Sequence, residues 1–335
     1  MGRRSPPAKV GPGITTRKIT MTTSTSPNEA KRSFTSFYAE PTPHGYLLEM
    51  SRLGYQIAEQ ARQYCVVAAG ILEDENPGWP TRMLDVGCSY GIGSAFIKYG
   101  CTFEELASFF SSRAPEDYAT CTAATRMWLN VVPPQIEMGV VGLDVAENAV
   151  KFAVDSGLLD CGIVKNLEVE ELSEDEIAWF SGCNLLICTG AIGYVGEQSF
   201  DRILPHLGSS RTETSGPAAV MTVLRMFDIG EVESSFNRVG MEVRKVPGVR
   251  LAQRGFADDE EMQGVLSVLA EKGIDPDGWE SHGVYYADLY VAALPGLVDR
   301  LVESMVETDD ERPLFTSHVA VASAQSPDEL TLPVG

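Results

Sequence analysis

The sequence predicts an α/β protein in which a mostly parallel sheet carries helices on both faces. Short apolar runs typical of buried strands alternate with amphipathic helical segments up to a fifth strand, and two further strands follow near the end of the chain. The first apolar run, residues 82–86, leads into a segment with glycines at positions 87, 91 and 93. This combination predicts a strand, a tight loop and a first helical turn whose backbone N–H groups face a ligand.

Each element has a local signal. Apolar residues at helical spacing over positions 34–73 predict two helices, which end at the Asn-Pro-Gly-Trp-Pro run of residues 76–80. Thr102 and Ser173 are each followed three residues later by glutamate, which predicts a capping box at two helix starts. The predicted strands are residues 82–86, 138–144, 161–164, 184–188, 218–224, 242–246 and 283–293, and further helices are predicted over residues 114–129, 147–154, 200–207, 228–239, 257–272 and 297–307.

A single domain accounts for most of the chain. Residues 1–33 are rich in Pro, Thr, Ser and Gly with hardly any apolar side chains, so we expect a disordered basic arm. Residues 34–308 form the predicted domain, with a helical lid over residues 34–75 and a helical insertion over residues 97–137. Periodicity is lost afterwards, and residues 309–335 are expected to be a flexible tail.

Composition argues against several classes of function. The net charge is −21 although the first 34 residues are basic, so the body of the protein is strongly acidic. An acidic surface disfavours contact with nucleic-acid phosphates and with anionic lipid, and no apolar run approaches the length of a membrane span. The seven cysteines include no C-x-x-C pair, and the four histidines show no metal-binding spacing. We expect a cytoplasmic protein with reduced cysteines, a small-molecule partner, and no metal, nucleic-acid or membrane partner.

Small or polar residues follow four of the predicted strands. They are the segment 85–93, Asp144, Asn166 and the segment 189–194. In open sheets of this type, ligands bind at the carboxyl ends of the strands, where the strand order reverses. An acidic residue at the end of the second strand can accept hydrogen bonds from both hydroxyls of a ribose, which makes Asp144 the candidate for binding a nucleoside.

These residues resemble the class I S-adenosylmethionine-dependent methyltransferases. Residues 84–91 (Leu-Asp-Val-Gly-Cys-Ser-Tyr-Gly) are similar to the first motif of that superfamily, and residues 142–150 (Gly-Leu-Asp-Val-Ala-Glu-Asn-Ala-Val) to its second. The resemblance covers roughly residues 80–293 and extends to a poorly characterised bacterial group acting on small molecules. It implies a Rossmann-like sheet of seven strands whose last strand, here residues 283–293, is reversed.

The resemblance also implies a cofactor, S-adenosyl-L-methionine. The resemblance places its methionine part against Asp85, Gly87, Cys88, Ser89 and Gly91, and its ribose against Asp144 and Val145. Its adenine would contact Asn166 and Leu167, and its methyl-transfer side would face Thr189, Gly190 and Ala191.

Two departures from the pattern of the superfamily stand out. Ser89 occupies a position where glycine is usual. The separation between Gly87 and Asp144 far exceeds the roughly 20 residues expected between such a loop and its ribose-binding acid. The insertion over residues 97–137 accounts for that length, and we expect it to form an added wall over the cofactor or a homodimer contact.

The glycine segment admits other interpretations. A dinucleotide loop fits less well, because the spacing is not G-x-G-x-x-G and no acidic residue ends a strand about 20 residues later. The letters G-x-S-x-G also match the nucleophile elbow of hydrolases, with Ser89 as nucleophile and Asp228 and His282 supplying the acid and the histidine. Against the elbow, Asp85 would place a charge where hydrolases keep an apolar residue, and no glycine-rich oxyanion segment precedes it.

For catalysis, the protein mainly has to position a nucleophile in line with the methyl group, and a base is needed only if the nucleophile must lose a proton. Candidate bases are His44 and His282, and Tyr194 could face a cation from its place beside a glycine loop. Tyr38 and Tyr46 are candidate substrate contacts.

The predicted function is methyl transfer to an O, N or C nucleophile of a small molecule of specialised metabolism. An alternative keeps the methyltransferase fold but assigns it an elimination or cyclisation, or the role of a partner subunit.

Overall fold

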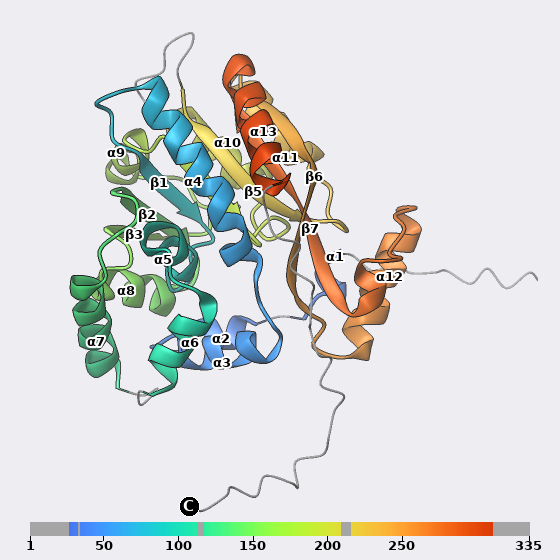
Figure 1. Ribbon diagram of the computed structural model, residues 1–335, viewed down its shortest axis with the longest axis horizontal. Helices are drawn as coiled ribbons and strands as arrows, with labels where there is room; N and C mark the ends of the chain where they lie inside the picture. Colours follow the sequence, from blue (N-terminus) through green and yellow to red (C-terminus); the bar gives the residue numbers. More distant parts are fainter. Residues whose placement is uncertain (1–26, 33, 113–116, 209–215, 311–335) are drawn as a thin grey trace, which may run out of the picture.

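Seven strands form one sheet in the computed structural model, which describes residues 27–32, 34–112, 117–208 and 216–310. The strand order is β3-β2-β1-β4-β5-β7-β6, with β7 antiparallel to both of its neighbours and the other pairs parallel. This Rossmann-like sheet with a reversed last strand confirms the predicted fold class (Figure 1). The strands are β1 (Arg82–Val86), β2 (Gly139–Asp144), β3 (Cys161–Val164), β4 (Leu185–Thr189), β5 (Ala218–Leu224), β6 (Glu242–Gly255) and β7 (Val284–Ala293).

Helices cover both faces of the sheet. Figure 1 shows α4 and α13 lying across the front of the strands. The helices are α1 (Pro27–Ala30), α2 (Thr35–Tyr38), α3 (His44–Arg52), α4 (Ile57–Glu75), α5 (Ile92–Tyr99), α6 (Phe103–Ser111), α7 (Tyr118–Val131), α8 (Glu147–Ser156), α9 (Glu174–Ser181), α10 (Glu197–Ile203), α11 (Gly230–Arg238), α12 (Asp259–Glu271) and α13 (Pro295–Asp310), with short 3-10 helices η1 (Leu204–His206) and η2 (Glu280–His282).

Each face of the sheet has its own hydrophobic core, and successive residues of the central strands belong to opposite cores. Met83 of β1 and Leu185 of β4 belong to the core that includes residues of α4, α5, α8 and α13. Their chain neighbours Leu84 and Leu186 belong to the other core, with Phe180 of α9 and residues of α10 and α11. Successive strand residues point to opposite faces, so a strand covered on both faces is apolar throughout. The central strands are therefore buried, and their polar residues gather at their carboxyl ends.

The predicted lid is smaller than expected. Ala61, Tyr64, Cys65 and Ala68 of α4 are completely buried, and this helix packs on β4, β5 and β6 as well as on α5 and α13. It is a core helix, so only α2 and α3 remain in front of the strand ends. The predicted insertion forms α6 and α7, which pack against α3 and α8. Both predicted capping boxes, at Thr102 and Ser173, are present.

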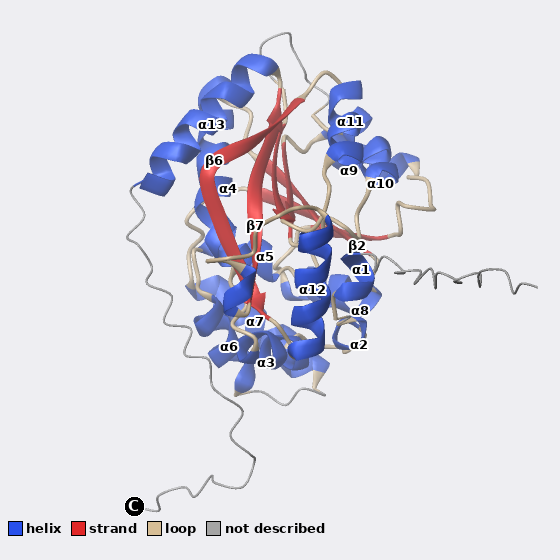
Figure 2. Ribbon diagram, turned by 90° about the vertical axis from the view of Figure 1, so that its right-hand side faces the viewer, coloured by secondary structure: helices blue, strands red, loops and turns tan. Residues whose placement is uncertain are grey.

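Strand β6 is much longer than the predicted 242–246. The prediction ended it at Pro247 and Gly248, but the strand continues past them with a shift of register between Lys245 and Arg250. An edge strand tolerates proline at a bulge, because its outer N–H groups need no partner strand. Figure 2 shows β6 and β7 as two long strands that run from α13 towards α12.

The chain before the lid is also ordered in part. Residues 27–32 were assigned to a disordered arm, yet α1 packs on α12 and Ala30 and Lys31 are buried. We call residues 27–32 the N-terminal segment. Residues 1–26 and 33 of the predicted arm, and residues 311–335 of the predicted tail, lie outside the described residues.

Candidate functional site

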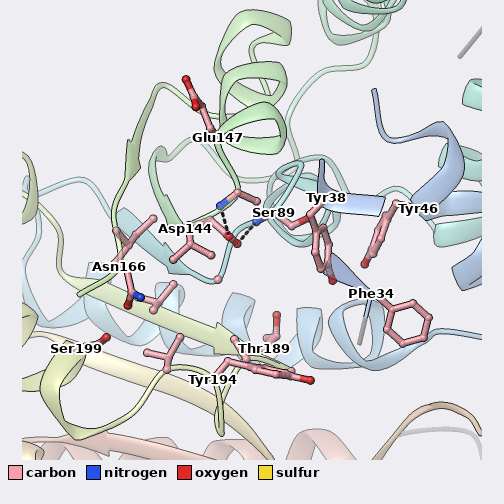
Figure 3. Close-up of a pocket in the computed structure, with 18 of the residues that line it drawn as sticks. Phe34, Tyr38, Tyr46, Ser89, Asp144, Glu147, Asn166, Thr189, Tyr194 and Ser199 are labelled. Atoms are coloured by element: carbon pink, nitrogen blue, oxygen red, sulfur yellow. Dashed lines mark hydrogen bonds between the residues drawn. The ribbon is translucent and has the colours of Figure 1, made fainter. Parts of the chain in front are cut away.

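A cavity of about 660 Å³ lies where β1, β2, β3 and β4 end. Figure 3 shows Asn166 and Ser199 at one end, Tyr46 and Phe34 at the other, and Asp144 between them. The volume falls in the range of about 300–1,000 Å³ typical of ligand sites. Its lining comes from three parts of the chain. They are the N-terminal segment and lid (Lys31, Phe34, Tyr38, Ala39, Tyr46, Met50, Tyr55), the strand ends with the loops and first helical turns that follow them (Val86, Gly87, Ser89, Leu143, Asp144, Val145, Ala146, Glu147, Asn148, Lys165, Asn166, Leu167, Glu168, Thr189, Gly190, Ala191, Tyr194, Val195, Ser199), and β6 (Gln253, Arg254).

The glycine loop is fixed against two neighbouring strand ends. The N–H groups of Gly87 and Cys88 both donate to the carbonyl oxygen of Leu143, at 2.8 and 3.2 Å. Gly87 has a φ of 80°, and a Cβ at this position would lie 2.6 Å from the Cβ of Ala191. Only glycine fits, because a side chain would meet both a strained backbone conformation and a steric clash.

Asp144 holds the loop from the end of β2. Its Oδ2 accepts a hydrogen bond from the N–H of Ser89 at 2.8 Å, and its Oδ1 accepts one from the N–H of Ala146 at 3.0 Å (Figure 3). Each carboxylate oxygen has a second lone pair. The carboxylate therefore has a fixed orientation in the cavity wall and remains able to accept hydrogen bonds from a ligand.

Ser89 has two unusual features. It is the one non-glycine residue with positive φ, 48°, in the part of the chain that the structure describes. This is the left-handed region, which explains why glycine is usual at the position. Its Oγ is also buried and has no hydrogen-bond partner among those residues, although Ser89 lines the cavity.

We expect Ser89→Gly to raise the free energy of unfolding by about 1 kcal/mol, because glycine relieves the left-handed strain. Ser89→Ala is the matched control: it removes the hydroxyl but keeps the strain, and its stability should equal that of the wild type. Urea unfolding followed by circular dichroism measures both. Equal stability of all three proteins would show that the backbone here is unstrained.

Three residues assigned to the cofactor lie behind the cavity wall. Asp85 is buried and accepts a hydrogen bond from Ser94 Oγ at 2.6 Å. Burial raises the pKa of its carboxyl to about 7, and the charge of Asp144 adds to the effect. Cys88 is buried and Gly91 caps the start of α5, so neither lines the cavity. The other nine assigned residues do line it.

An aromatic wall faces the glycine loop. The rings of Tyr38 and Tyr46 lie 5.6 Å apart and those of Tyr46 and Tyr55 lie 6.4 Å apart. Burial raises the pKa of all three phenols, to about 12 for Tyr55, so they are neutral at physiological pH. Tyr90, from the glycine loop itself, donates its hydroxyl to the carbonyl oxygens of Phe37 and Glu40 at 2.7 and 2.8 Å. That hydroxyl ties the lid to the loop.

Two cationic side chains, Lys31 and Arg254, line the cavity together with Tyr194. Tyr194 is 52% exposed, and Lys31 Nζ lies 4.9 Å from the centre of its ring. The structure therefore already supplies a cation for the cation–π contact that the sequence suggested for Tyr194. Arg254 reaches the cavity from β6 next to Gln253, whose Oε1 is buried with no partner among the described residues.

The two candidate histidines lie elsewhere. His44 Nδ1 is 3.4 Å from the carbonyl oxygen of Phe110, in a second depression between α3 and α6. His282 is exposed in η2 and lines neither cavity. The hydrolase alternative required Ser89 to contact a histidine, and the Ser89 hydroxyl has no such partner among the described residues. The structure does not assemble that triad.

Four lining residues discussed above were not among those predicted from the sequence: Lys31, Tyr55, Gln253 and Arg254. Gln253 and Arg254 follow a predicted strand that was ended too early, and the apolar alternation at Val249 and Leu251 was the available signal. A second register shift, between Ala252 and Gly255, explains how two consecutive residues both reach the cavity.

Lys31 and Tyr55 had no signal of their own in the sequence, because polar residues in a Pro- and Ser-rich segment and a single tyrosine between two helices mark no site.

The described residues have the features of neither a metal site nor a membrane-spanning helix. They include no cluster of three His, Cys, Asp or Glu side chains arranged to hold a metal ion. None of their helices combines the length and apolar character needed to cross a bilayer.

The strand order and the reversed β7 are those that the resemblance to class I methyltransferases implied. No protein-family model and no curated protein matches the sequence. Solved structures similar to this chain include several methyltransferases and a protein described as a precorrin-8w decarboxylase. They include a TehB-like enzyme from Corynebacterium glutamicum, with 14% identity and a TM-score of 0.33 over 67% of this chain and 85% of that one.

Two further similar structures are described with ligands. One is the magnesium protoporphyrin IX methyltransferase of Synechocystis with bound SAM, at 11% identity and a TM-score of 0.32 over 74% of this chain and 84% of that one. The other is the plantazolicin methyltransferase BpumL in complex with SAH, at 10% identity and a TM-score of 0.37 over 77% and 96%.

Proposed function

We propose that this protein is an S-adenosylmethionine-dependent methyltransferase that acts on a small molecule of specialised metabolism. The observation that carries the proposal is Asp144, whose carboxylate is oriented by two backbone N–H groups in the wall of a large cavity. A carboxylate at the end of the second strand is the acceptor that a ribose requires.

The residues around Asp144 suit the rest of such a cofactor. Gly87 brings the backbone of the loop to the cavity without a side chain, and a Cβ there would clash with Ala191. Ser89 Oγ and Gln253 Oε1 are buried polar atoms without a partner among the described residues, and such atoms call for a ligand. Asn166 and Leu167 offer an amide and an apolar surface for the adenine.

S-adenosylmethionine supplies an activated methyl group when it is bound. The chain itself has to hold the acceptor in line and exclude water. Tyr38 and Tyr46 form the wall opposite Asp144, and their raised pKa values keep them protonated, so they suit hydrogen-bond donation to the acceptor and not proton abstraction. With neither histidine in the cavity, we propose no side chain as general base.

The lining of the cavity supports a small molecule as the acceptor. The N-terminal segment, α2 and α3 lie over its aromatic end, which leaves room for a small molecule beside the nucleoside. The net charge of −21 supports a partner that is not a nucleic acid. The acceptor atom, O, N or C, is part of the proposal, as are the cytoplasmic location and a homodimer.

Isothermal titration calorimetry with S-adenosylmethionine and S-adenosylhomocysteine tests the proposal. We expect both to bind with one site per chain, and S-adenosylhomocysteine to raise the melting temperature. Absence of binding by both at micromolar protein concentration would overturn the proposed function. Binding without methyl transfer to any candidate acceptor would favour the elimination, cyclisation or partner-subunit alternative.

A further inference from the structure

The ammonium group of a largely buried lysine opens onto the cavity. Lys31 is only 9% exposed and lines the cavity, with its Nζ over the ring of Tyr194. Among the residues that the structure describes, no carboxylate lies within ion-pair distance of this Nζ and no acceptor hydrogen-bonds to it. A buried charge without a partner is costly, and proteins normally pair it.

The neighbouring Arg254 has a countercharge of its own, the carboxylate of Glu261. Its Nη1 and Nη2 donate to the two carboxylate oxygens of Glu261 at 2.9 and 2.7 Å, and its guanidinium lies 4.8 Å from the ring centres of both Phe34 and Tyr285. Glu261 has no lone pair to spare for Lys31, since it also accepts the N–H groups of Arg32 and Ala257. One positive charge therefore remains uncompensated in this group.

Lys31 is held in place from two sides. Asn28 Nδ2 donates to the carbonyl oxygen of Gly193 at 2.6 Å, which ties the N-terminal segment to the loop after β4. The N–H of Arg32 donates to Glu261 at 2.7 Å, which ties the same segment to α12. A charge fixed in advance binds a ligand with less loss of conformational entropy than a mobile surface lysine does.

We propose that the acceptor carries a carboxylate group that pairs with Lys31, which makes Lys31 the residue that selects anionic acceptors. The inference rests on the proposed function and names its substrate class. A carboxylate carries the single negative charge that balances one ammonium, whereas a phosphate dianion would leave an excess negative charge in the same buried place. Phe34, Tyr38 and Tyr46 beside it suit an apolar or aromatic molecular body.

The protonation state of Lys31 agrees with this role. Burial lowers the pKa of its ammonium to about 8, and Arg254 lowers it further while Glu261 opposes the shift. The group is charged at neutral pH and becomes neutral above pH 8. The other groups around it do not titrate near this pH, because the pKa of Glu261 is lowered to about 2, that of Arg254 is raised, and that of Tyr194 is raised by burial.

Three small probes test the proposal on the full chain saturated with S-adenosylhomocysteine: benzoate, benzamide and phenyl phosphate. We expect benzoate to raise the melting temperature and to bind measurably in calorimetry, and benzamide and phenyl phosphate to do neither. Benzoate affinity should be nearly constant between about pH 6 and pH 7, where both the carboxylate and the ammonium are charged, and should fall towards about tenfold per pH unit above pH 8, because only the ammonium form of Lys31 pairs with the anion.

Variants assign the effect to the side chain. Lys31→Met should weaken benzoate at least about tenfold and leave the affinity for S-adenosylhomocysteine unchanged, whereas Lys31→Arg should retain benzoate binding. The matched control is Lys272→Met, which removes an exposed lysine after α12 and should behave as wild type.

The outcomes distinguish a failure of the carboxylate assignment from a failure of the proposed function. Benzoate binding that survives in Lys31→Met, equal effects of benzoate and benzamide, or no benzoate effect on wild type bound to S-adenosylhomocysteine would overturn the carboxylate assignment alone. Binding of phenyl phosphate but not benzoate would overturn it in favour of a phosphorylated acceptor. Failure of the wild type to bind S-adenosylhomocysteine would overturn the proposed function as well.

Discussion

Replacing Asp144 by alanine is expected to weaken the binding of S-adenosylhomocysteine by at least about 100-fold. The carboxylate would accept two hydroxyl groups of the ribose, and hydrogen bonds to a charged group contribute about 1.5–3 kcal/mol each. The same substitution removes the acceptor of the N–H groups of Ser89 and Ala146, so the loop that carries Gly87 also loses its anchor. Isothermal titration calorimetry of the variant and the wild type measures the effect.

The opposite end of the same strand offers a matched control. Asp160 Oδ2 accepts the N–H of Val140 at 2.6 Å, which makes it another carboxylate bound to the backbone of β2, far from the cavity lining. Asp160→Ala should cost comparable stability and leave ligand affinity unchanged. Wild-type affinity in Asp144→Ala would contradict the assignment of the ribose to β2, and equal losses in both variants would mean that only the folding of β2 matters.

Glu261→Gln is expected to lower the free energy of unfolding by about 3–5 kcal/mol, because it leaves Arg254 buried without a countercharge. The Arg254 and Glu261 side chains are 2% and 3% exposed, so water compensates little. Arg254→Met in the Glu261→Gln background should recover part of the loss by removing the unpaired charge. Urea unfolding at pH 7 measures the series, and a loss below about 1 kcal/mol in Glu261→Gln would contradict the prediction.

The carboxylate of Glu261 also makes the free energy of unfolding depend on pH. Burial alone would raise the pKa of Glu261, but the hydrogen bonds and charge of Arg254, with two backbone N–H groups, lower it from 4.5 to about 2. A depressed folded-state pKa stabilises the protein above the unfolded-state value and loses that contribution as the pH falls from about 4.5 towards 2. The stability difference between wild type and Glu261→Gln should therefore narrow over this interval, by about 3 kcal/mol in total.

The fold could be predicted because its signals are local. Strands β1, β3 and β5 have the predicted bounds, since each is a short apolar run between turn residues. The cavity wall around Asp144 and Thr189 could also be predicted, because residues that directly follow parallel strands must meet at one edge of the sheet. The end of β6 was predicted wrongly, because Pro247 and Gly248, which lie at a bulge inside the strand, are residue types that usually end a strand.

Residue type proved a poor guide to the acceptor end. His44 and His282 were candidates because histidine is the usual base, yet both lie outside the cavity. Lys31 was assigned to a disordered arm, although its segment is anchored to Glu261, more than two hundred residues away along the chain. Contacts at such separation leave no pattern in either stretch of sequence.

The sequence by itself determined the mostly parallel sheet between two layers of helices and the glycine loop with Asp144 beside it, because hydrophobic period, turn chemistry and strand-end position are properties of neighbouring residues. The reversed last strand was expected only from the resemblance to class I methyltransferases. Tyr38 and Tyr46 were already candidates from the sequence, but only the tertiary structure placed Tyr55, Gln253 and the buried Lys31 in the same cavity. Those residues come from the N-terminal segment, the lid and β6, and packing between distant parts of the chain is what brings them together. Ser89 needed both the sequence and the structure. The sequence showed a serine where glycine is usual, and the structure shows that the backbone there is left-handed, which is why glycine is usual.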